Sequence, residues 1–348
     1  MDAHPIPAAH RIRIAGSDAV FDCADGDTLL RAAQRAGLGF PYECNVGSCG
    51  NCKFELVEGA LQMAWEQAPG WTDKDRARKR YLGCQAQPLG ACSVKLRLDP
   101  RCAPVHKPLR GDARLQARRA ITHDISEFRF ALALAQRFEP GQYALAHLDG
   151  VVGARAWSMS NAPIDDNADG AVWEFQVRRL AGGKGSDALF DALQIGQCIG
   201  VDGPYGMAWL RRDAPRDILC LAGGSGLAPM VSIARGAMAE PQLAQRQLHF
   251  LYGARTPADV CGQELLRALP GWGERLDYQA VVSDAAARDG GWSGAVGYLH
   301  QAALERFGER LAQMEIYFAG PPAMANATQR MLLDAGVPMA QVHFDQFY

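Results

Sequence analysis

The sequence predicts a multidomain chain in which a small cysteine-rich domain precedes an antiparallel β-barrel and a doubly wound α/β domain. Three observations support this fold class. Cysteines gather in a glycine-rich loop near the N-terminus, and short strands separated by turn clusters occupy the middle of the chain. Apolar strands alternate with helices in the last third. At ordinary domain sizes, 348 residues correspond to two or three domains.

The composition excludes several classes of protein. The net charge is −2, from 36 basic and 38 acidic residues, so we expect no nucleic-acid partner and no anionic membrane surface. No apolar run approaches the ~18–20 residues of a membrane span. The first five residues lack the basic start and apolar stretch of a secretory signal. We therefore expect a soluble cytoplasmic protein without membrane insertion. Its ten cysteines then indicate metal or redox chemistry rather than a disulfide framework.

Two linkers divide the chain. Residues 99–108 contain three prolines, which remove backbone donors and favour extended structure. Residues 211–216 are polar and precede the apolar run 217–222. The resulting domains are residues 1–102, 110–212 and 214–348.

The first domain begins with alternating apolar residues at Ile12 and Ile14. Asp27 or Thr28 can cap a helix over 29–36, which Gly37 ends. The cysteine-rich loop follows this helix.

Four cysteines in this domain have the spacing of a plant-type [2Fe–2S] site, with four residues inside the first pair and two inside the second. The metal ligands are Cys44, Cys49, Cys52 and Cys84. Gly47 and Gly50 let the loop wrap closely, because they lack a Cβ. The alternatives are a zinc site or four unrelated buried cysteines. Zinc prefers two short C-x-x-C knuckles, so the spacing favours the iron–sulfur cluster.

The middle domain has strand-like segments at 128–134 and 171–180, with turns at 139–141 and 165–167. Between them lie four consecutive residues suited to a flavin: Arg155, Ala156, Trp157 and Ser158. Arg155 could bind the pyrophosphate, Trp157 could stack on the isoalloxazine, and Ser158 could donate near N5. On an extended strand, 155 and 157 share one face and 158 points to the other. The simpler alternative is an arginine on a surface strand.

A second cluster in the middle domain also suits a flavin dinucleotide. Its members are Gln176, Val177, Arg178, Gly182, Gly183, Gly185 and Ser186. The glycines precede a helical stretch, 186–193, whose N–H groups could hold phosphate. A glycine-rich turn alone is weak evidence. With an iron–sulfur domain before it and a nucleotide domain after it, the set favours FAD.

The third domain alternates strands at 218–222, 248–252 and 316–319 with helices, one of which starts at 228. A glycine turn between the first strand and that helix suits a pyrophosphate, and the residues are Gly223, Gly224, Ser225 and Gly226. Gly320 and Pro321 form a second turn after a strand, at the sheet edge where ligands bind.

With these residues in place, the chain resembles the reductase components of bacterial aromatic-ring and alkyl-side-chain oxygenases, over essentially its whole length. The toluene and xylene monooxygenase reductases are especially similar. The resemblance implies a β-grasp [2Fe–2S] ferredoxin domain, an FAD barrel and an NAD domain of the ferredoxin–NADP reductase superfamily. The matching motifs are R-x-Y-S at 155–158, F-x-P-G-Q-Y at 138–143, G-P-Y-G at 203–206, Y-G-A-R at 252–255 and D-x-F at 345–347. This sequence departs from the family at Trp157, which replaces the usual Tyr, and at Ala319, which replaces the Cys of C-G-P-P.

The resemblance implies that NADH passes a hydride to FAD, and that single electrons leave through the cluster to an oxygenase or its Rieske ferredoxin component. Ser158 would act at the flavin. Phe347, or Tyr348 in reserve, would cover the flavin face that the nicotinamide must occupy, although these rings could instead fill a core gap. The preference for NADH also rests on the resemblance. Arg255 could instead bind the 2′-phosphate of NADPH.

Two other functions stay open. The same three modules could serve a deoxysugar reductase by handing electrons to a pyridoxamine enzyme, or the chain could be an iron–sulfur protein without turnover. The basic residues 73–80 could dock a partner, although a solvated helix face is the simpler interpretation.

Overall fold

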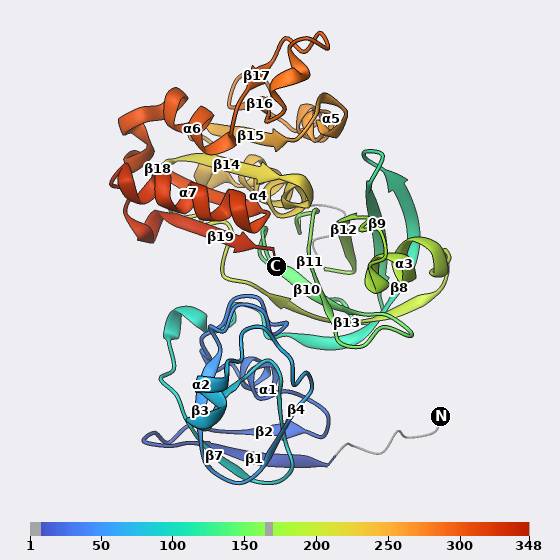
Figure 1. Ribbon diagram of the computed structural model, residues 1–348, viewed down its shortest axis with the longest axis vertical. Helices are drawn as coiled ribbons and strands as arrows, with labels where there is room; N and C mark the ends of the chain where they lie inside the picture. The colour runs from blue at the N-terminus through green and yellow to red at the C-terminus, as the bar shows by residue number, and fades with distance from the viewer. Residues whose placement is uncertain (1–7, 164–169, 348) are drawn as a thin grey trace. The chain divides into compact units, whose positions relative to one another are not determined.

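The computed structural model describes residues 8–163 and 170–347, and its chain forms two compact units (Figure 1). One unit comprises residues 1–110 with 152–156, and the other comprises 111–151 with 157–348. The expected turn at 165–167 and Tyr348 lie outside the described residues. Over the described ranges, no helix has the length and hydrophobicity needed to cross a membrane.

The first unit is built on a five-stranded mixed sheet in the order β2-β1-β7-β3-β5. β1 and β7 are parallel, and the other pairs are antiparallel. Its elements are β1 (Ala9–Ile14), β2 (Val20–Ala24), α1 (Leu29–Arg35), β3 (Lys53–Glu58), β4 (Leu61–Met63), α2 (Asp73–Ala77), β5 (Arg80–Leu82), β6 (Ala86–Pro88) and β7 (Cys92–Lys95). The alternation at Ile12 and Ile14 places both side chains in the core with Leu29 and Leu30 of α1. This is the β-grasp arrangement expected from the sequence.

The start of α1 differs from the expected cap. Thr28 occupies the N-cap position, but its side chain makes no capping hydrogen bond, and its buried hydroxyl has no partner among the described residues. Asp27 instead accepts a hydrogen bond from the Thr28 backbone N–H at 2.8 Å and pairs with Arg35 at 2.5 Å. The carboxylate therefore ties the first turn of the helix to its last.

A six-stranded antiparallel sheet, nearly closed into a barrel, has the order β11-β10-β13-β8-β9-β12, and it belongs to the second unit except for residues 109–110 and 155–156. The strands are β8 (Leu109–Ala120), β9 (Ile125–Leu132), β10 (Tyr143–His147), β11 (Arg155–Ser158), β12 (Val172–Arg178) and β13 (Cys198–Tyr205). A bridge from Met159 to Phe175 joins the end of β11 to β12. Buried aromatic rings fill the interior, including Phe128, Phe130, Phe138, Trp173 and Phe175. The helical stretch expected after β12 is a short α3 (Lys184–Asp187) continued by a π-helix (Ala188–Ala192).

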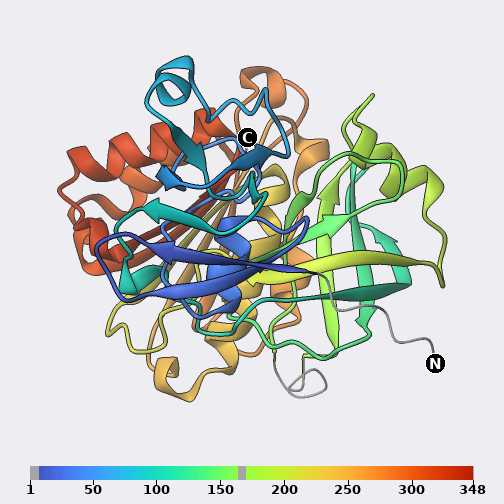
Figure 2. The ribbon, with the colours of Figure 1, turned by 90° about the horizontal axis from the view of Figure 1, so that it is seen from below.

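The remainder of this unit is a parallel sheet in the order β17-β16-β15-β14-β18-β19. The elements are β14 (Asp217–Gly223), α4 (Leu227–Ala239), β15 (Leu248–Ala254), α5 (Gln263–Arg267), β16 (Leu276–Val282), β17 (Ala295–Val296), α6 (Leu299–Phe307), β18 (Met314–Gly320), α7 (Pro322–Asp334) and β19 (Val342–Gln346). Side chains alternate along β14, so Cys220 packs with α4 and Leu219 with α6 and α7. Figures 1 and 2 show α4 in yellow and α7 in red on opposite faces of the sheet. The doubly wound topology is confirmed.

Helix α4 fastens this α/β part to the barrel. The Ser232 hydroxyl accepts a hydrogen bond from the Gly141 N–H at 3.2 Å and donates one to the Asn161 carbonyl at 2.6 Å. One turn later, Arg235 donates to the Ser160 carbonyl at 2.9 Å and lies 3.3 Å from the Glu174 carboxylate. Buried polar groups on the helix are thus paired with barrel backbone, which fixes the two parts of this unit together.

Candidate cofactor and electron-transfer sites

The four expected metal ligands meet in one place. Cys52 directly precedes β3, and Cys84 is separated from the end of β5 by one residue. The two strands pair with Lys53 opposite Leu82. This register brings the Cys52 and Cys84 sulfurs to 3.4 Å of each other. In the preceding loop, the Cys49 N–H lies 3.3 Å from the Cys44 sulfur. The pairing therefore brings together two cysteine sulfurs that are 32 positions apart in sequence.

The loop that carries three of these cysteines needs its glycines. Gly47 and Gly50 have φ values of 90° and 80°, which residues with a side chain rarely adopt. A Cβ added at Gly70, which packs against the loop, would lie 2.7 Å from the Gly50 nitrogen. Close backbone packing turns N–H groups toward sulfur, as at Asn51, whose N–H lies 3.5 Å from the Cys49 sulfur. Such contacts are a principal means of tuning a cluster.

The electrostatics of the loop favour a thiolate at Cys44, whereas hydrogen bonds to neighbouring ligand sulfurs, and then burial, raise the pKa values of Cys49 and Cys52. A hydrogen bond from the Cys49 thiol, and then backbone N–H groups of the loop, lower the pKa of Cys44 to about 5 although burial opposes this change. A thiolate is the form that binds iron. Four converging sulfurs, with N–H donors around them, fit a [2Fe–2S] cluster.

The other six cysteines are dispersed and free: Cys23, Cys92, Cys102, Cys198, Cys220 and Cys261. Burial raises the pKa of Cys23 to about 12, which keeps that thiol protonated and unreactive. Cys198 is exposed on the barrel.

Strand β11 displays the first set of flavin-motif residues. The Arg155 Nη1 atom lies 3.3 Å from each of three carbonyl oxygens, those of residues 152–154. Trp157 is half-buried, and its ring centre lies 5.8 Å from that of Phe175 in the barrel core. Ser158 is buried and Ala156 is exposed, although alternation places these two side chains on the same face of the strand.

The second set lies on β12 and the turn after it. The Gln176 side chain donates to Glu127 at 2.9 Å, while its buried carbonyl oxygen has no partner among the described residues. An orphaned buried acceptor is the feature that a bound flavin donor would satisfy. Val177 faces the barrel core. In the following turn, the Ser186 hydroxyl accepts the Leu180 N–H at 2.9 Å. The glycines of this turn, Gly182, Gly183 and Gly185, lie at the start of α3.

The glycine turn of the third domain packs tightly on β18. β14 ends at Gly223, a 3-10 turn covers Gly224–Gly226, and α4 starts at Leu227. A Cβ at Gly226 would lie 2.0 Å from the Ala319 carbonyl oxygen. The Tyr252 hydroxyl donates to the Gly224 carbonyl at 3.3 Å, and burial raises the pKa of Tyr252, so the hydroxyl keeps its proton.

A pocket lies beside this turn at the carboxyl end of the strands. Gly223, Gly224, Tyr252, Arg255 and Pro321 line it from the α/β part, and Asp124 and Arg178 line it from the barrel. The Arg178 guanidinium comes within 3.5 Å of the position of a Gly224 Cβ. The sequence grouped Arg178 with the flavin residues, whereas the structure places its charged end beside the nucleotide turn. Ser225 and Gly226 complete the turn, and Gly320 precedes Pro321.

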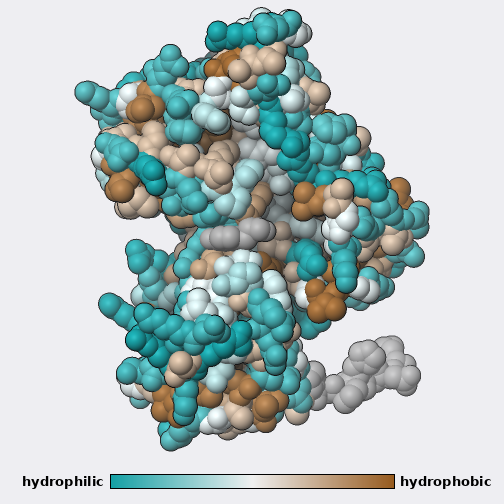
Figure 3. Space-filling model, viewed as in Figure 1, coloured by the Kyte–Doolittle hydropathy of each residue, from teal (hydrophilic) through white to brown (hydrophobic). Residues whose placement is uncertain are grey.

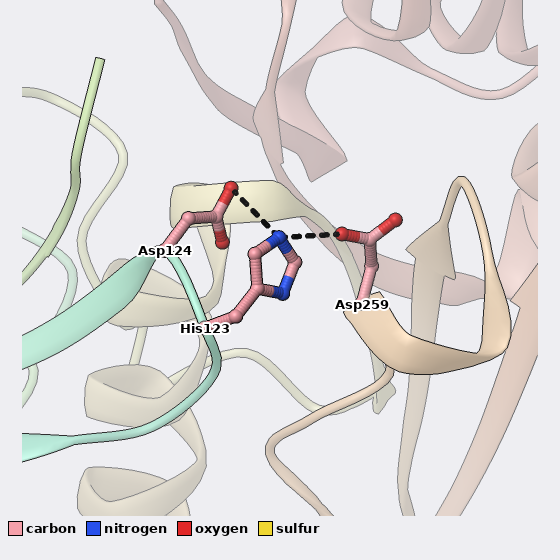
Figure 4. A group of neighbouring side chains, drawn as sticks. All are labelled: His123, Asp124 and Asp259. Carbon is pink, nitrogen blue, oxygen red and sulfur yellow. Dashed lines mark ion pairs between the residues drawn. The ribbon is translucent and has the colours of Figure 1, made fainter. Parts of the chain in front are cut away.

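His123, Asp124 and Asp259 cluster at the rim of this pocket (Figure 4). The imidazole Nε2 lies 3.9 Å from the Asp124 carboxylate and 3.8 Å from that of Asp259. Each carboxylate also has a guanidinium partner, with Arg178 2.6 Å from Asp124 and Arg255 3.7 Å from Asp259. The three side chains therefore belong to an ion-pair network with Arg178 and Arg255.

The C-terminal strand places Phe347 at the same edge of the sheet. β19 runs parallel to β18, and the Phe347 N–H donates to the Gly320 carbonyl at 3.2 Å. The ring is half-buried against the core on the α4 side of the sheet. Ala319, where the family has Cys, is fully buried in β18 beneath the glycine turn.

Sequence reasoning missed several pocket residues, namely Asp124, Ser283 and Tyr298. Ser283 directly follows β16, so the rule that ligands bind at the carboxyl ends of parallel strands could have found it. Asp124 belongs to a barrel turn far away in sequence, and no sequence pattern marked it as a pocket residue.

Comparisons with known proteins agree with this arrangement. Residues 12–89 match the 2Fe-2S iron-sulfur cluster binding domain, 112–209 the oxidoreductase FAD-binding domain and 220–330 the oxidoreductase NAD-binding domain. The chain is 37% identical to the ferredoxin–NAD(P)+ reductase CarAd of Metapseudomonas resinovorans, over 94% of this chain and 96% of that protein. It is 35% identical to the ferredoxin–NAD+ reductase component of the alkene monooxygenase system of Xanthobacter autotrophicus, over 94% and 97%. The solved structure of the ferredoxin reductase in carbazole 1,9a-dioxygenase superposes with a TM-score of 0.89 at 34% identity, over 98% and 99% of the two chains.

Proposed function

Since this chain belongs to the ferredoxin–NAD(P)+ reductase components of aromatic and alkene oxygenase systems, we propose that it takes electrons from NADH and delivers them one at a time, through its cysteine-bound cluster, to an oxygenase or to that enzyme's Rieske ferredoxin. It is an oxidoreductase with [2Fe–2S], FAD-binding and NAD-binding domains. The observation that carries the route is that Cys44, Cys49 and Cys52 share one loop and that the Cys84 sulfur lies 3.4 Å from the Cys52 sulfur. The relatives from the alkene monooxygenase system and from carbazole 1,9a-dioxygenase favour an oxygenase partner over the deoxysugar and non-catalytic alternatives.

The nicotinamide nucleotide is assigned to the pocket beside the glycine turn. The backbone N–H groups at Gly224–Gly226 and the amino end of the 13-residue helix α4 suit a pyrophosphate. Arg178 supplies a positive charge there and is held in place by Asp124. Phe347 lies at the same sheet edge through its bond to Gly320, which supports a role in admitting the nicotinamide ring.

The flavin is assigned to β11, β12 and the turn at 182–186. When bound, FAD accepts a hydride and the [2Fe–2S] cluster passes electrons singly. Trp157 offers an aromatic face, the orphaned Gln176 oxygen offers an acceptor, and Ser158 offers a hydroxyl on the other side of the strand. The network from Ser232 and Arg235 to the barrel keeps these residues in a fixed relation to the nucleotide turn.

We place the protein in the cytoplasm. All ten cysteines are free in the structure, and thiols stay reduced in that compartment. The domain limits 1–102, 110–212 and 214–348 are proposed on the linkers described above.

The substitution Cys52→Ala tests the electron route. NADH should still reduce a small two-electron dye, because those steps need only the FAD and NAD domains. Reduction of a one-electron protein acceptor, with cytochrome c as the probe, should collapse. Cys198→Ala removes an exposed thiol away from the loop and is the matched control, with both activities retained. If Cys52→Ala reduces cytochrome c at the full rate, electrons leave directly from the flavin and the proposed route is wrong.

A further inference from the structure

Charge is divided unevenly along the chain. Residues 1–110 carry fifteen basic and twelve acidic side chains, whereas residues 111–348 carry 21 basic and 26 acidic ones. The cluster-bearing unit is therefore net positive in a protein that is net negative overall. Residues 74–80 account for all of this excess, because five of these seven residues are basic and one is acidic: Lys74, Arg76, Arg78, Lys79 and Arg80 are the basic ones.

These five side chains are exposed, and little acidic charge offsets them. Arg76 lies 3.6 Å from the Asp73 carboxylate. No carboxylate within the described part of the chain lies within 4.0 Å of the other four basic groups. The acidic residue inside the segment, Asp75, is buried and paired with Lys53 at 2.8 Å. Figure 3 shows strongly hydrophilic side chains over the region where Figure 1 labels α2. The segment presents positive charge to solvent.

The segment is held against the cluster loop. The Gly70 N–H, just before α2, donates to the Gly47 carbonyl of the loop at 2.9 Å. Lys53, the ion-pair partner of Asp75, directly follows the ligand Cys52. Thr72 and Asp75 form a capping box that fixes the start of α2. The basic groups are therefore mounted on the same rigid support as the cluster ligands.

Aromatic side chains accompany these charges. Trp65 is 41% exposed, and a Cβ at Gly47 would lie 3.2 Å from its indole ring. The Arg76 guanidinium lies 3.8 Å from the ring centre of Trp71. Tryptophan and arginine are enriched at the centres of protein interfaces, where an exposed indole can be covered by a partner.

Resting on the proposed function, we propose that the surface formed by Trp65, Lys74, Arg76, Arg78 and Lys79, here named the basic docking surface, receives an acidic patch on the electron-accepting protein. Positive charge beside the cluster steers an acidic acceptor toward the point at which electrons leave. The indole of Trp65 then supplies apolar contact next to the loop. An acceptor rich in Asp and Glu at its own docking site fits this surface, and a basic acceptor does not.

Two soluble haem proteins of opposite charge test the proposal as one-electron acceptors: the acidic haem domain of cytochrome b5 and the basic cytochrome c. The double variant Lys74→Glu/Arg78→Glu is compared with the control Arg13→Glu/Arg97→Glu, which changes the net charge of the same unit equally at exposed positions on and after its strands. Each variant is assayed with NADH from 20 to 500 mM NaCl. The visible spectrum of the cluster and the reduction of a two-electron dye report whether the protein is intact.

Reduction of cytochrome b5 by the wild type should fall with added salt. At low salt it should be about tenfold slower with Lys74→Glu/Arg78→Glu, and this difference should shrink toward 500 mM because salt screens exposed charge. Cytochrome c should respond in the opposite direction, and the control pair should behave like the wild type. Equal effects of the two double variants would overturn the proposal, as would wild-type reduction of cytochrome b5 that is independent of salt. The variant Cys52→Ala distinguishes a failure of the proposed electron route from a failure of the basic docking surface. If Cys52→Ala still reduces both cytochromes, the proposed route fails, whereas a salt-independent rate that requires Cys52 refutes only the basic docking surface.

Discussion

Replacing Gly226 with Ala should disable the nicotinamide-nucleotide site while leaving the other cofactor domains intact. The added Cβ would lie 2.0 Å from the Ala319 oxygen and 2.4 Å from the Ala319 carbonyl carbon. Both are backbone atoms in the central strand β18, so no side-chain rotation can relieve the overlap. Because contacts under 3.0 Å essentially do not occur, the glycine turn and β18 must separate by about 1 Å. A misplacement of ~1 Å can cost ~100-fold in rate. We therefore expect kcat/KM for NADH to fall about a hundredfold.

The assay is stopped-flow reduction of the flavin by NADH, followed by its visible absorbance. Chemical reduction of the cluster and the content of bound FAD should match the wild type, since neither depends on this turn. Gly290→Ala is the control, because that glycine belongs to the same α/β part, has no left-handed conformation and would place its Cβ 3.4 Å from the nearest atom. A Gly226→Ala enzyme whose kcat/KM for NADH stays within threefold of the wild type would refute the argument that close packing sets the geometry of this site.

Three further outcomes are expected. Burial raises the pKa of Asp75, but hydrogen bonds from Lys53 and Thr72 outweigh it and lower this pKa to about 2. The stability that the Asp75 carboxylate contributes should therefore be complete above about pH 4 and be lost as the pH falls toward 2. Asp75→Asn should lower the free energy of unfolding, measured by urea denaturation, by about 2 kcal/mol at pH 7 and by little at pH 2. NADH should give a higher kcat/KM than NADPH because the Asp259 carboxylate, 3.7 Å from Arg255, would repel a 2′-phosphate bound there, and the reverse preference would contradict this. Phe347→Ala should tighten nicotinamide binding, seen as stronger charge-transfer absorbance; a variant that loses stability at unchanged affinity would show that the ring only fills the core.

The sequence was sufficient for the features that depend on local pattern. The cysteine spacing predicted a ligand set whose members the fold brings near one another, since a single loop carries three of them. The strand–glycine–helix pattern located the turn at 223–226 because both sides of it are contiguous in sequence. The alternation of apolar segments with helical segments along the chain likewise located β14, β15 and β18 to within two residues.

What could not be predicted depends on contacts between distant segments. Arg178 was grouped with the flavin residues on β12, yet its charged end lies beside Gly224, since the Asp124 carboxylate from a distant turn pairs with it. Of the two expected caps, Asp27 and Thr28, the Thr28 side chain makes no capping hydrogen bond, for a related reason. Asp27 was available to bond both the Thr28 N–H and Arg35, so the Thr28 hydroxyl was left without a role. Neither result follows from residue type and spacing alone.

Helix α4 fixes the spacing between the glycine turn and the barrel. Its amino end carries the glycine turn, and Ser232 and Arg235, six and nine residues beyond Gly226, bond the barrel backbone. At 1.5 Å of rise per residue, the turn lies about 9 to 14 Å along the helix axis from these anchors. The length of this one helix thus helps to set the separation between the proposed NADH and FAD sites. An insertion of one residue in this stretch would rotate every later side chain by about 100° around the axis and withdraw both anchors from the barrel at once.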